Sequence, residues 1–344
     1  METQPGYQGF SPSSYGAASM PQPTAPPPAQ PPMMRPLSTG EILDRTLALY
    51  RRHFWLFVGI GTVPAAVVAL STGLRLLFLN TYIKFPSPTA GNPRAASQAV
   101  GAAALLQVEF LPALLLILVT YGIAQAATVR AVQELSLGTL PTAAEAYGAI
   151  RDRWLRWTGI VLRQLWSAAW PMSVGVLLVM IALLLPGGAN AHPAAFVSLV
   201  LLAWLLIIAG LVLGVLNYLH VALAPAAGVM ENLGVNASLR RSRTLVSGRK
   251  GRIFLALLLV YVLHMVAGGL QLPFALLAGT MHGAQRILLL AADLLIAFVA
   301  TALVSPVASI ALAMFYTDER VRREGYDIEL LLQRSIAERA EAGA

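Results

Sequence analysis

The chain has 344 residues, of which 57% are hydrophobic and only 12% charged, and its formal net charge is +8 at pH 7. Soluble domains have roughly 45–50% apolar and about 25% charged residues, so this composition argues against a soluble core. The absence of cysteine excludes disulfides, thiolate catalysis, iron–sulfur clusters and cysteine-ligated zinc, and five scattered histidines leave little for a metal site. The basic residues are nearly all arginines beside hydrophobic segments, which argues against nucleic acid as a partner.

Residues 1–34 carry a single charged side chain, Glu2, and are rich in Pro, Gln, Ser, Gly, Tyr and Ala. Such a segment cannot bury enough apolar surface to offset the entropy of ordering, so we predict a disordered, Pro-rich cytoplasmic tail. It has neither the basic start nor the apolar core of a signal peptide. A docking arm for a partner protein is the alternative role.

Four stretches carry almost no charge, at about 54–74, 110–129, 164–230 and 253–316. The third is interrupted at Pro186, Gly187 and Gly188, and the fourth around residues 273–282, so each of these two contains a pair of helices. Because roughly 20 apolar residues span a bilayer, and only helices or closed barrels satisfy the backbone in lipid, we predict an all-α fold with six transmembrane helices. The expected domains are the tail 1–34, a membrane domain 35–316 and a partly helical cytoplasmic tail 317–344.

Basic residues gather before the first predicted membrane helix, between the second and third, between the fourth and fifth, and after the sixth. The opposite loops have only Arg75, Lys84, Arg94 and Arg286. The positive-inside rule therefore predicts that both termini are cytoplasmic. We expect a multi-pass protein of the cell (inner) membrane of a bacterium-like cell.

Each cytoplasmic segment has the pattern of a short amphipathic helix before a membrane hairpin. Ser38 with Glu41 and Thr142 with Glu145 form predicted capping boxes, and Asn236 is a weaker candidate N-cap. The apolar stripes are Leu43, Leu47, Tyr50 and Phe54; Tyr147, Ile150, Trp154 and Trp157; and Val235, Leu239 and Val246, which share their face with Ser242. We predict three repeats, each an interfacial helix followed by a hairpin of two membrane helices. Amphipathic juxtamembrane segments without any repeat are the alternative.

One candidate site consists of polar residues inside the predicted membrane helices: Asn217, His220, His264 and Asp293. Such groups are costly in lipid and usually face a bundle interior, where these four together would line a path for a substrate or protons. Interhelical hydrogen bonding is the simpler explanation of each.

A second candidate site is the basic run between the fourth and fifth predicted helices: Arg240, Arg241, Arg243, Arg249, Lys250 and Arg252. Guanidinium groups bind phosphate bidentately, so this run is a candidate for lipid headgroups. The alternative is that its charge only sets the topology.

Three segments resemble a known family. They are RPLSTGEILDRTLALYRRHF at the start, GVMENLGVNASLRRSRTLVSGRKGRIF in the middle and SPVASIALAMFYTDERVRREGYDIELLL at the end. Together they resemble the membrane domain family named after glycerophosphoryl diester phosphodiesterases, from Arg35 to about Leu332. The catalytic barrel of those enzymes needs roughly 250 residues, and no segment outside the predicted membrane helices approaches that length. The resemblance therefore implies the membrane domain alone.

The sequence favours a non-enzymatic integral membrane module that organises anionic lipid, or docks a membrane or cytoplasmic protein, through its arginine-rich cytoplasmic face. We expect no cofactor and no catalytic or metal site. The alternative is a transporter of a small solute or lipid that uses the intramembrane polar residues. An enzyme acting on a lipid headgroup is the least favoured, because no nucleophile–base pair or metal cluster is visible.

Overall fold

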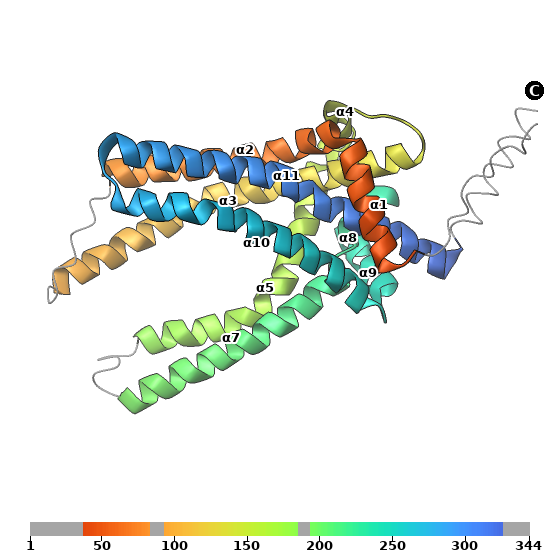
Figure 1. Cartoon of the computed structure of the whole chain (residues 1–344). Helices are drawn as coiled ribbons and strands as arrows, with labels where there is room; N and C mark the ends of the chain where they lie inside the picture. The colour runs from red at the N-terminus through yellow and green to blue at the C-terminus, as the bar shows by residue number, and fades with distance from the viewer. Residues whose placement is uncertain (1–36, 83–92, 185–192, 326–344) are drawn as a thin grey trace, which may run out of the picture. The chain divides into compact units, whose positions relative to one another are not determined.

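The computed structural model describes the backbone of residues 37–82, 93–184 and 193–325, and the side chains of 37–77, 111–182 and 193–325. Every regular element in these residues is a helix, as predicted. The elements are α1 (Thr39–Arg52), α2 (Phe54–Tyr82), α3 (Pro93–Ser136), α4 (Ala143–Gly148), the 3-10 helix η1 (Arg151–Arg153), α5 (Trp154–Leu184), α7 (Pro193–Val221), α8 (Ala224–Met230), α9 (Val235–Val246), α10 (Lys250–Thr280) and α11 (Gly283–Glu324) (Figure 1).

Within the described residues, six helical segments are long and apolar enough to cross a membrane, which confirms the predicted number of spans. The ends differ from the prediction in two places. Pro273 lies inside α10, and the last break falls at Met281 and His282. The final helix, α11, continues past residue 316 to Glu324, so the first residues of the segment predicted as a partly helical tail are continuous with the sixth long helix. The predicted break at residues 186–188 and the tail 1–34 lie outside the described residues.

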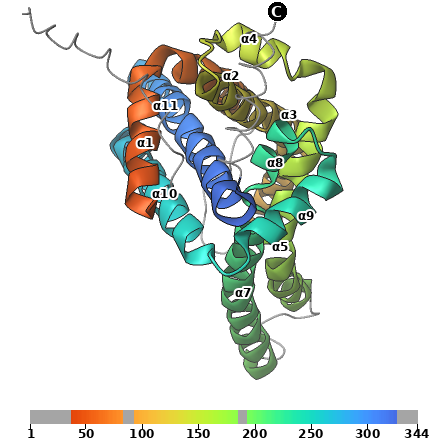
Figure 2. The ribbon, with the colours of Figure 1, turned by 90° about the vertical axis from the view of Figure 1, so that its right-hand side faces the viewer.

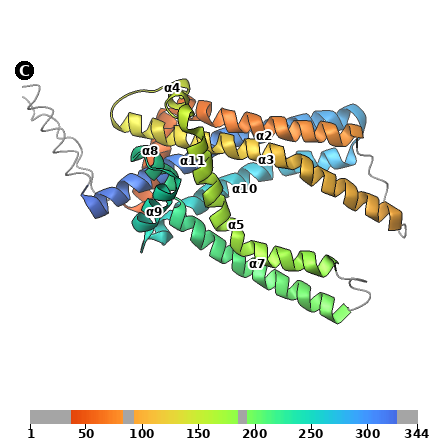
Figure 3. The same cartoon turned by 180° about the vertical axis from the view of Figure 1, so that it is seen from behind.

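The long helices α2, α3, α10 and α11 pack side by side, whereas α5 and α7 pack mainly against each other. The α5–α7 hairpin leans away from the other four helices toward its far end (Figures 1 and 3). Small residues let its two helices approach closely: a Cβ added to Gly210 would lie only 2.6 Å from the carbonyl oxygen of Pro171.

The buried core lies at one end of the bundle, where α1, α8 and α9 pack against α11 and the short α4 packs against α2 and α3 (Figure 2). We call this region the short-helix end. Phe57, Leu223 and Tyr316 are fully buried there, whereas leucines along the outer faces of the long helices are largely exposed. This distribution fits helices that contact lipid along their length and protein at one end.

Tyrosines of the short helices satisfy carbonyl groups near prolines in the long helices. Pro64 has no N–H to donate to the carbonyl oxygen of Ile60, and the Tyr147 hydroxyl donates to that oxygen at 2.7 Å. Near Pro306 of α11, the Tyr50 hydroxyl donates to a carbonyl oxygen at 2.9 Å. These contacts fasten α4 to α2 and α1 to α11.

Side chains also satisfy the backbone carbonyl groups at the break between α7 and α8. Pro225 leaves the carbonyl oxygen of Val221 without its helical donor, and Nε2 of buried Gln164 donates to it at 2.8 Å. The Ser242 hydroxyl donates to the carbonyl oxygen of His220 at 2.9 Å. Irregular backbone is tolerated at membrane depth only where protein or water supplies such partners.

Both predicted capping boxes are confirmed. The Glu41 N–H donates to Ser38 Oγ at 3.2 Å, and the Ser38 N–H donates to the Glu41 carboxylate at 2.7 Å. The prediction for α9 is wrong, because its N-cap is Gly234, whose extended backbone starts the helix at Val235. Asn236 lies exposed in the first turn.

The predicted stripe of α1 is only partly the face that packs on the protein. Ile42 and Thr46 are fully buried, whereas Leu47 of the stripe is 39% exposed. In the second segment α4 has only six residues, and Trp154 begins α5 instead of extending the short helix. The repeat arrangement and the interfacial position of the short helices remain predictions.

Candidate functional site at the short-helix end

The predicted headgroup residues lie on α9 and at the start of α10, and the structure divides them into two groups. Arg241, Arg249 and Arg252 are paired with carboxylates. Among the described side chains, no carboxylate lies within ion-pair distance of Arg240, Arg243 or Lys250. Arg240 and Arg243 are exposed, and Lys250 is half-buried.

Arg252 is the centre of the paired group. Its guanidinium lies 3.1 Å from a carboxylate oxygen of Asp318 and 3.1 Å from one of Glu319, and both acidic side chains are only 1% exposed. A buried carboxylate is tolerated only when charge and hydrogen bonds compensate it. Arg249 approaches Glu319 at 3.4 Å and adds to this compensation.

The same carboxylates hold the chain where it enters α1. The N–H of Leu37 donates to Asp318 Oδ1 at 2.7 Å, and Arg252 Nη2 donates to the Leu37 carbonyl oxygen at 2.6 Å. Arg322 reaches both Asp318 and the same carbonyl oxygen. The start of α1, the start of α10 and the end of α11 are therefore joined through one set of charges.

Arg241 of α9 makes a second set of ion pairs. Its guanidinium contacts Glu324 at 2.5 Å and Glu231 at 2.7 Å, and the Tyr316 hydroxyl donates to the Glu231 carboxylate. The hydrogen bonds with Glu324 and Glu231 raise the pKa of Arg241, against an opposing effect of burial. Arg241 therefore keeps its charge.

We call these residues the ion-pair cluster. It consists of the carboxylates Glu231, Asp318, Glu319 and Glu324 and the arginines Arg241, Arg249, Arg252, Arg320, Arg322 and Arg323. Sequence reasoning treated its α9–α10 arginines as a headgroup site because it had no way to place the acidic residues of α11 beside them. The signal available was the acidic and basic exit segment, in which the adjacent Asp318 and Glu319 are followed within four residues by three arginines.

The predicted intramembrane polar set is not joined into a network. Among the described residues, no hydrogen bond or ion pair links any two of Asn217, His220, His264 and Asp293. His264 is exposed, and its Nδ1 lies 3.0 Å from the carbonyl oxygen of Val260 on its own helix. Asp293 is half-buried on α11, and its Oδ1 has no partner among the described residues.

Sequence reasoning missed a different polar group inside the bundle. Gln125, Thr128 and Ser309 are almost fully buried, and they line a small cavity between α2, α3 and α11. The Thr128 hydroxyl is used within α3, where it donates to the carbonyl oxygen of Ala124 at 2.9 Å. Neutral side chains of this kind have no charge pattern that would mark them in the sequence.

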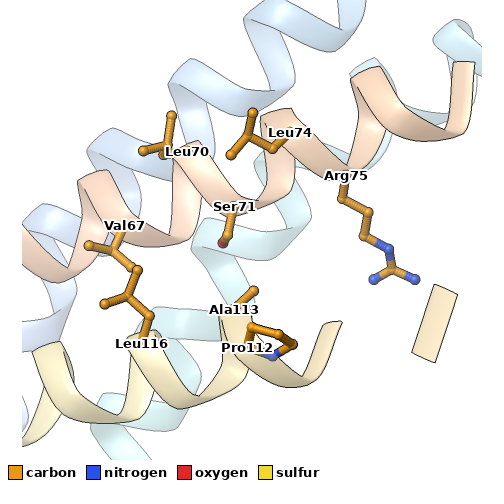
Figure 4. Close-up of a pocket in the computed structure, with 8 residues that line it drawn as sticks. All are labelled: Val67, Leu70, Ser71, Leu74, Arg75, Pro112, Ala113 and Leu116. Carbon is orange, nitrogen blue, oxygen red and sulfur yellow. The ribbon is translucent and has the colours of Figure 1, made fainter. Parts of the chain in front are cut away.

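Nearer the opposite end, α2 and α3 enclose an open groove (Figure 4). Figure 4 shows aliphatic side chains of both helices along it, with Arg75 as the single charged residue. An aliphatic groove open to the side suits an acyl chain better than a polar solute. The described residues contain no group of three or more His, Cys, Asp or Glu that could hold a metal ion.

The comparisons with known proteins give one match. A family model described as a domain of unknown function (DUF7847) matches residues 45–319, which include five of the six candidate spans in full and the sixth, on α11, as far as Glu319. No curated protein and no solved structure matches the chain. The match shows no link to the glycerophosphoryl diester phosphodiesterase membrane domain, so that expected resemblance gains no support.

Proposed function

The chain belongs to the DUF7847 family, a domain of unknown function, and from this premise we propose that it is a non-enzymatic membrane module that organises anionic lipid at its short-helix end. One observation carries the proposal. Arg240, Arg243 and Lys250 stand beside the ion-pair cluster, but no described carboxylate neutralises them. Their charge is therefore available to lipid headgroups.

The ion-pair cluster supports this role by holding in place the helices that carry these cations. Its ion pairs join α9 and the start of α10 to the end of α11, so the neighbouring cations lie on elements that are held together. Each basic residue near an anionic leaflet contributes about 1 kcal/mol of attraction. This attraction depends on charge, so lysine replaces arginine in it without loss.

The proposal includes an orientation in the cell membrane, with both termini and the short-helix end in the cytoplasm. Support comes from the uneven distribution of arginines between the two sets of loops. The chain has no cysteine, so a single Ser247→Cys variant tests the orientation directly. Labelling of this exposed position by an impermeant reagent from outside the cell would contradict it.

Lipid mass spectrometry on purified protein tests the headgroup role. The triple variant Arg240→Gln, Arg243→Gln, Lys250→Gln should lose about 3 kcal/mol of summed attraction and with it most co-purifying anionic lipid. Arg286→Gln, at an exposed cation of the opposite end, is the control and should retain it. Equal anionic lipid in the triple variant and the parent would remove the proposal.

A further inference from the structure

We infer that the short-helix end also contains a discrete binding site for a phosphate group, in a pocket between α3, η1, α5 and the turn after α8. Arg130 and Gln133 of α3, Arg153 of η1, Trp157 of α5 and Asn232 after α8 line it. Its volume is about 350 Å³, within the roughly 300–1,000 Å³ of small-molecule sites. We call it the Asn232 pocket.

Two arginines converge on one neutral atom at the edge of this pocket: Arg153 lines the pocket, and Arg156 lies beside it. Arg153 Nη1 and Arg156 Nη1 both donate to Asn232 Oδ1, the latter at 2.8 Å. Among the described side chains, no carboxylate lies within ion-pair distance of either guanidinium. Each guanidinium has five N–H donors. The amide oxygen of Asn232 accepts from Nη1 of each arginine, and Nη1 of Arg156 also lies 3.5 Å from the Asn232 carbonyl oxygen. Two adjacent positive charges with unused donors favour an anion, and the planar fork matches phosphate.

The turn that carries Asn232 is fixed by its backbone. Asn232 has φ 54°, in the left-handed region that Asn tolerates, and the N–H of Leu233 donates to the carbonyl oxygen of Gly228 at 3.1 Å. This is the hydrogen bond of a Schellman helix end. The preceding residue, Glu231, belongs to the ion-pair cluster, so its carboxylate is committed to Arg241. The turn therefore presents an amide, not a carboxylate, to Arg153.

The ring of Trp157, in the wall of the pocket, holds Arg156 in place. The guanidinium carbon of Arg156 lies 5.5 Å from the ring centre of Trp157, within cation–π range. Trp157 is buried, and its Nε1 donates to the carbonyl oxygen of Ile150 at 3.0 Å. The geometry that a phosphate needs is thus present before a ligand arrives.

The α3 wall adds an acceptor. Gln133 Oε1 is buried and has no hydrogen-bond partner among the described residues. The Arg130 charge is offset by Glu134, 2.7 Å away on the same helix. The pocket therefore offers donors on the Arg153 side, and rotation of the buried Gln133 amide would add an acceptor on the α3 side, which together suit a phosphate that carries a hydroxyl. An anionic phospholipid headgroup and free phosphate share this chemistry.

The inference goes beyond the proposed function, because that function rests on the charge of Arg240, Arg243 and Lys250 outside the pocket. The test is thermal unfolding of the full chain in detergent, titrated separately with dioctanoyl phosphatidylglycerol and with inorganic phosphate. The double variant Arg153→Lys, Arg156→Lys keeps the charge but loses the forks, and its apparent affinity should fall at least tenfold. The control Arg151→Lys, a neighbouring exposed arginine beside Asp152, should titrate like the parent.

Asn232→Gly is the second variant, because glycine keeps the left-handed turn and removes the amide oxygen that aligns the arginines. It should unfold like the parent without ligand and bind severalfold more weakly. Stabilisation by the lipid alone identifies a headgroup site, and equal sensitivity with inorganic phosphate identifies a free-phosphate site. The proposal is overturned if the double variant titrates like the parent with both probes. The triple glutamine variant at Arg240, Arg243 and Lys250 should keep this binding, which separates failure of the pocket from failure of the proposed function.

Discussion

Two arginine-rich regions lie at the short-helix end, and they differ in what faces them. In the ion-pair cluster, α11 places Asp318 and Glu319 against Arg252. In the Asn232 pocket, the turn after α8 places a neutral amide against Arg153 and Arg156. The first region uses its arginines to hold helices together, and the second leaves their charge unbalanced.

The comparison shows that arginine density does not identify a binding site. Removing one partner of a buried ion pair leaves an uncompensated charge and is strongly destabilising. Arginines held by an amide near the surface contribute little to stability, because solvent screens them. Substitutions in the ion-pair cluster should therefore change mainly the free energy of unfolding. Substitutions of the same kind in the Asn232 pocket should change mainly the affinity for an anion.

The largest effect is expected for Asp318→Asn. The variant removes the only described carboxylate that pairs with Arg322 and one of the two that pair with Arg252, and it should lower the free energy of unfolding by about 3–5 kcal/mol. Thermal unfolding in mild detergent measures this loss. The control is Asp152→Asn, since the Asp152 side chain is 89% exposed and its pair with Arg151 should contribute almost nothing. Equal melting of the two variants would show that the cluster does not hold the fold.

The next largest effect is expected when arginine is exchanged for lysine, which should destabilise the ion-pair cluster more than the Asn232 pocket. Arg252→Lys keeps a charge near Asp318 but loses the fork that also serves Glu319 and Leu37, so we expect a loss of about 1–3 kcal/mol in the free energy of unfolding. The Arg153→Lys, Arg156→Lys double variant should change stability by less than about 1 kcal/mol. A larger stability loss in the double variant would make the pocket arginines structural.

The local part of this architecture follows from the sequence. The capping boxes at Ser38 and Thr142 join residues three apart, and the six spans follow from apolar length, so neither depends on distant contacts. The stripe of α1 shows the limit of periodicity. Apolar residues on adjacent faces include both Ile42 and Leu47, and only the position of the neighbouring helices decides which is buried.

The candidate sites depend on distant contacts. Arg252 meets Asp318 across 66 residues, and Arg156 meets Asn232 across 76, so neither pairing is visible as a spacing. Asn232 also owes its place to a left-handed backbone that asparagine tolerates but does not require. The sequence could therefore identify the basic segments but could not separate paired arginines from unpaired ones.

Asn232→Asp would place a carboxylate beside the pocket arginines, as in the ion-pair cluster. Aspartate tolerates the left-handed turn and would place a carboxylate against Arg153 and Arg156, so stability should rise by about 0.2–1 kcal/mol, the range of a partly exposed ion pair. Its charge would offset one of the two guanidiniums and repel phosphate, so apparent affinity for phosphatidylglycerol should fall at least tenfold. Unfolding with and without lipid measures both. Unchanged lipid affinity would mean that the unbalanced charge of these arginines does not attract the anion.

The smallest effect is expected at the exposed cations beside the cluster. The Arg240→Lys, Arg243→Lys double variant keeps both charges, and neither side chain has a described carboxylate whose geometry a fork would serve, so stability should change by less than about 0.5 kcal/mol. Co-purifying anionic lipid should also stay at the parent level, because attraction to a charged leaflet depends on charge. Lipid mass spectrometry beside the glutamine triple variant supplies the comparison. If lysine lost as much lipid as glutamine, Arg240 and Arg243 would be binding headgroups by shape, and the distinction between diffuse attraction here and a discrete site at the Asn232 pocket would fail.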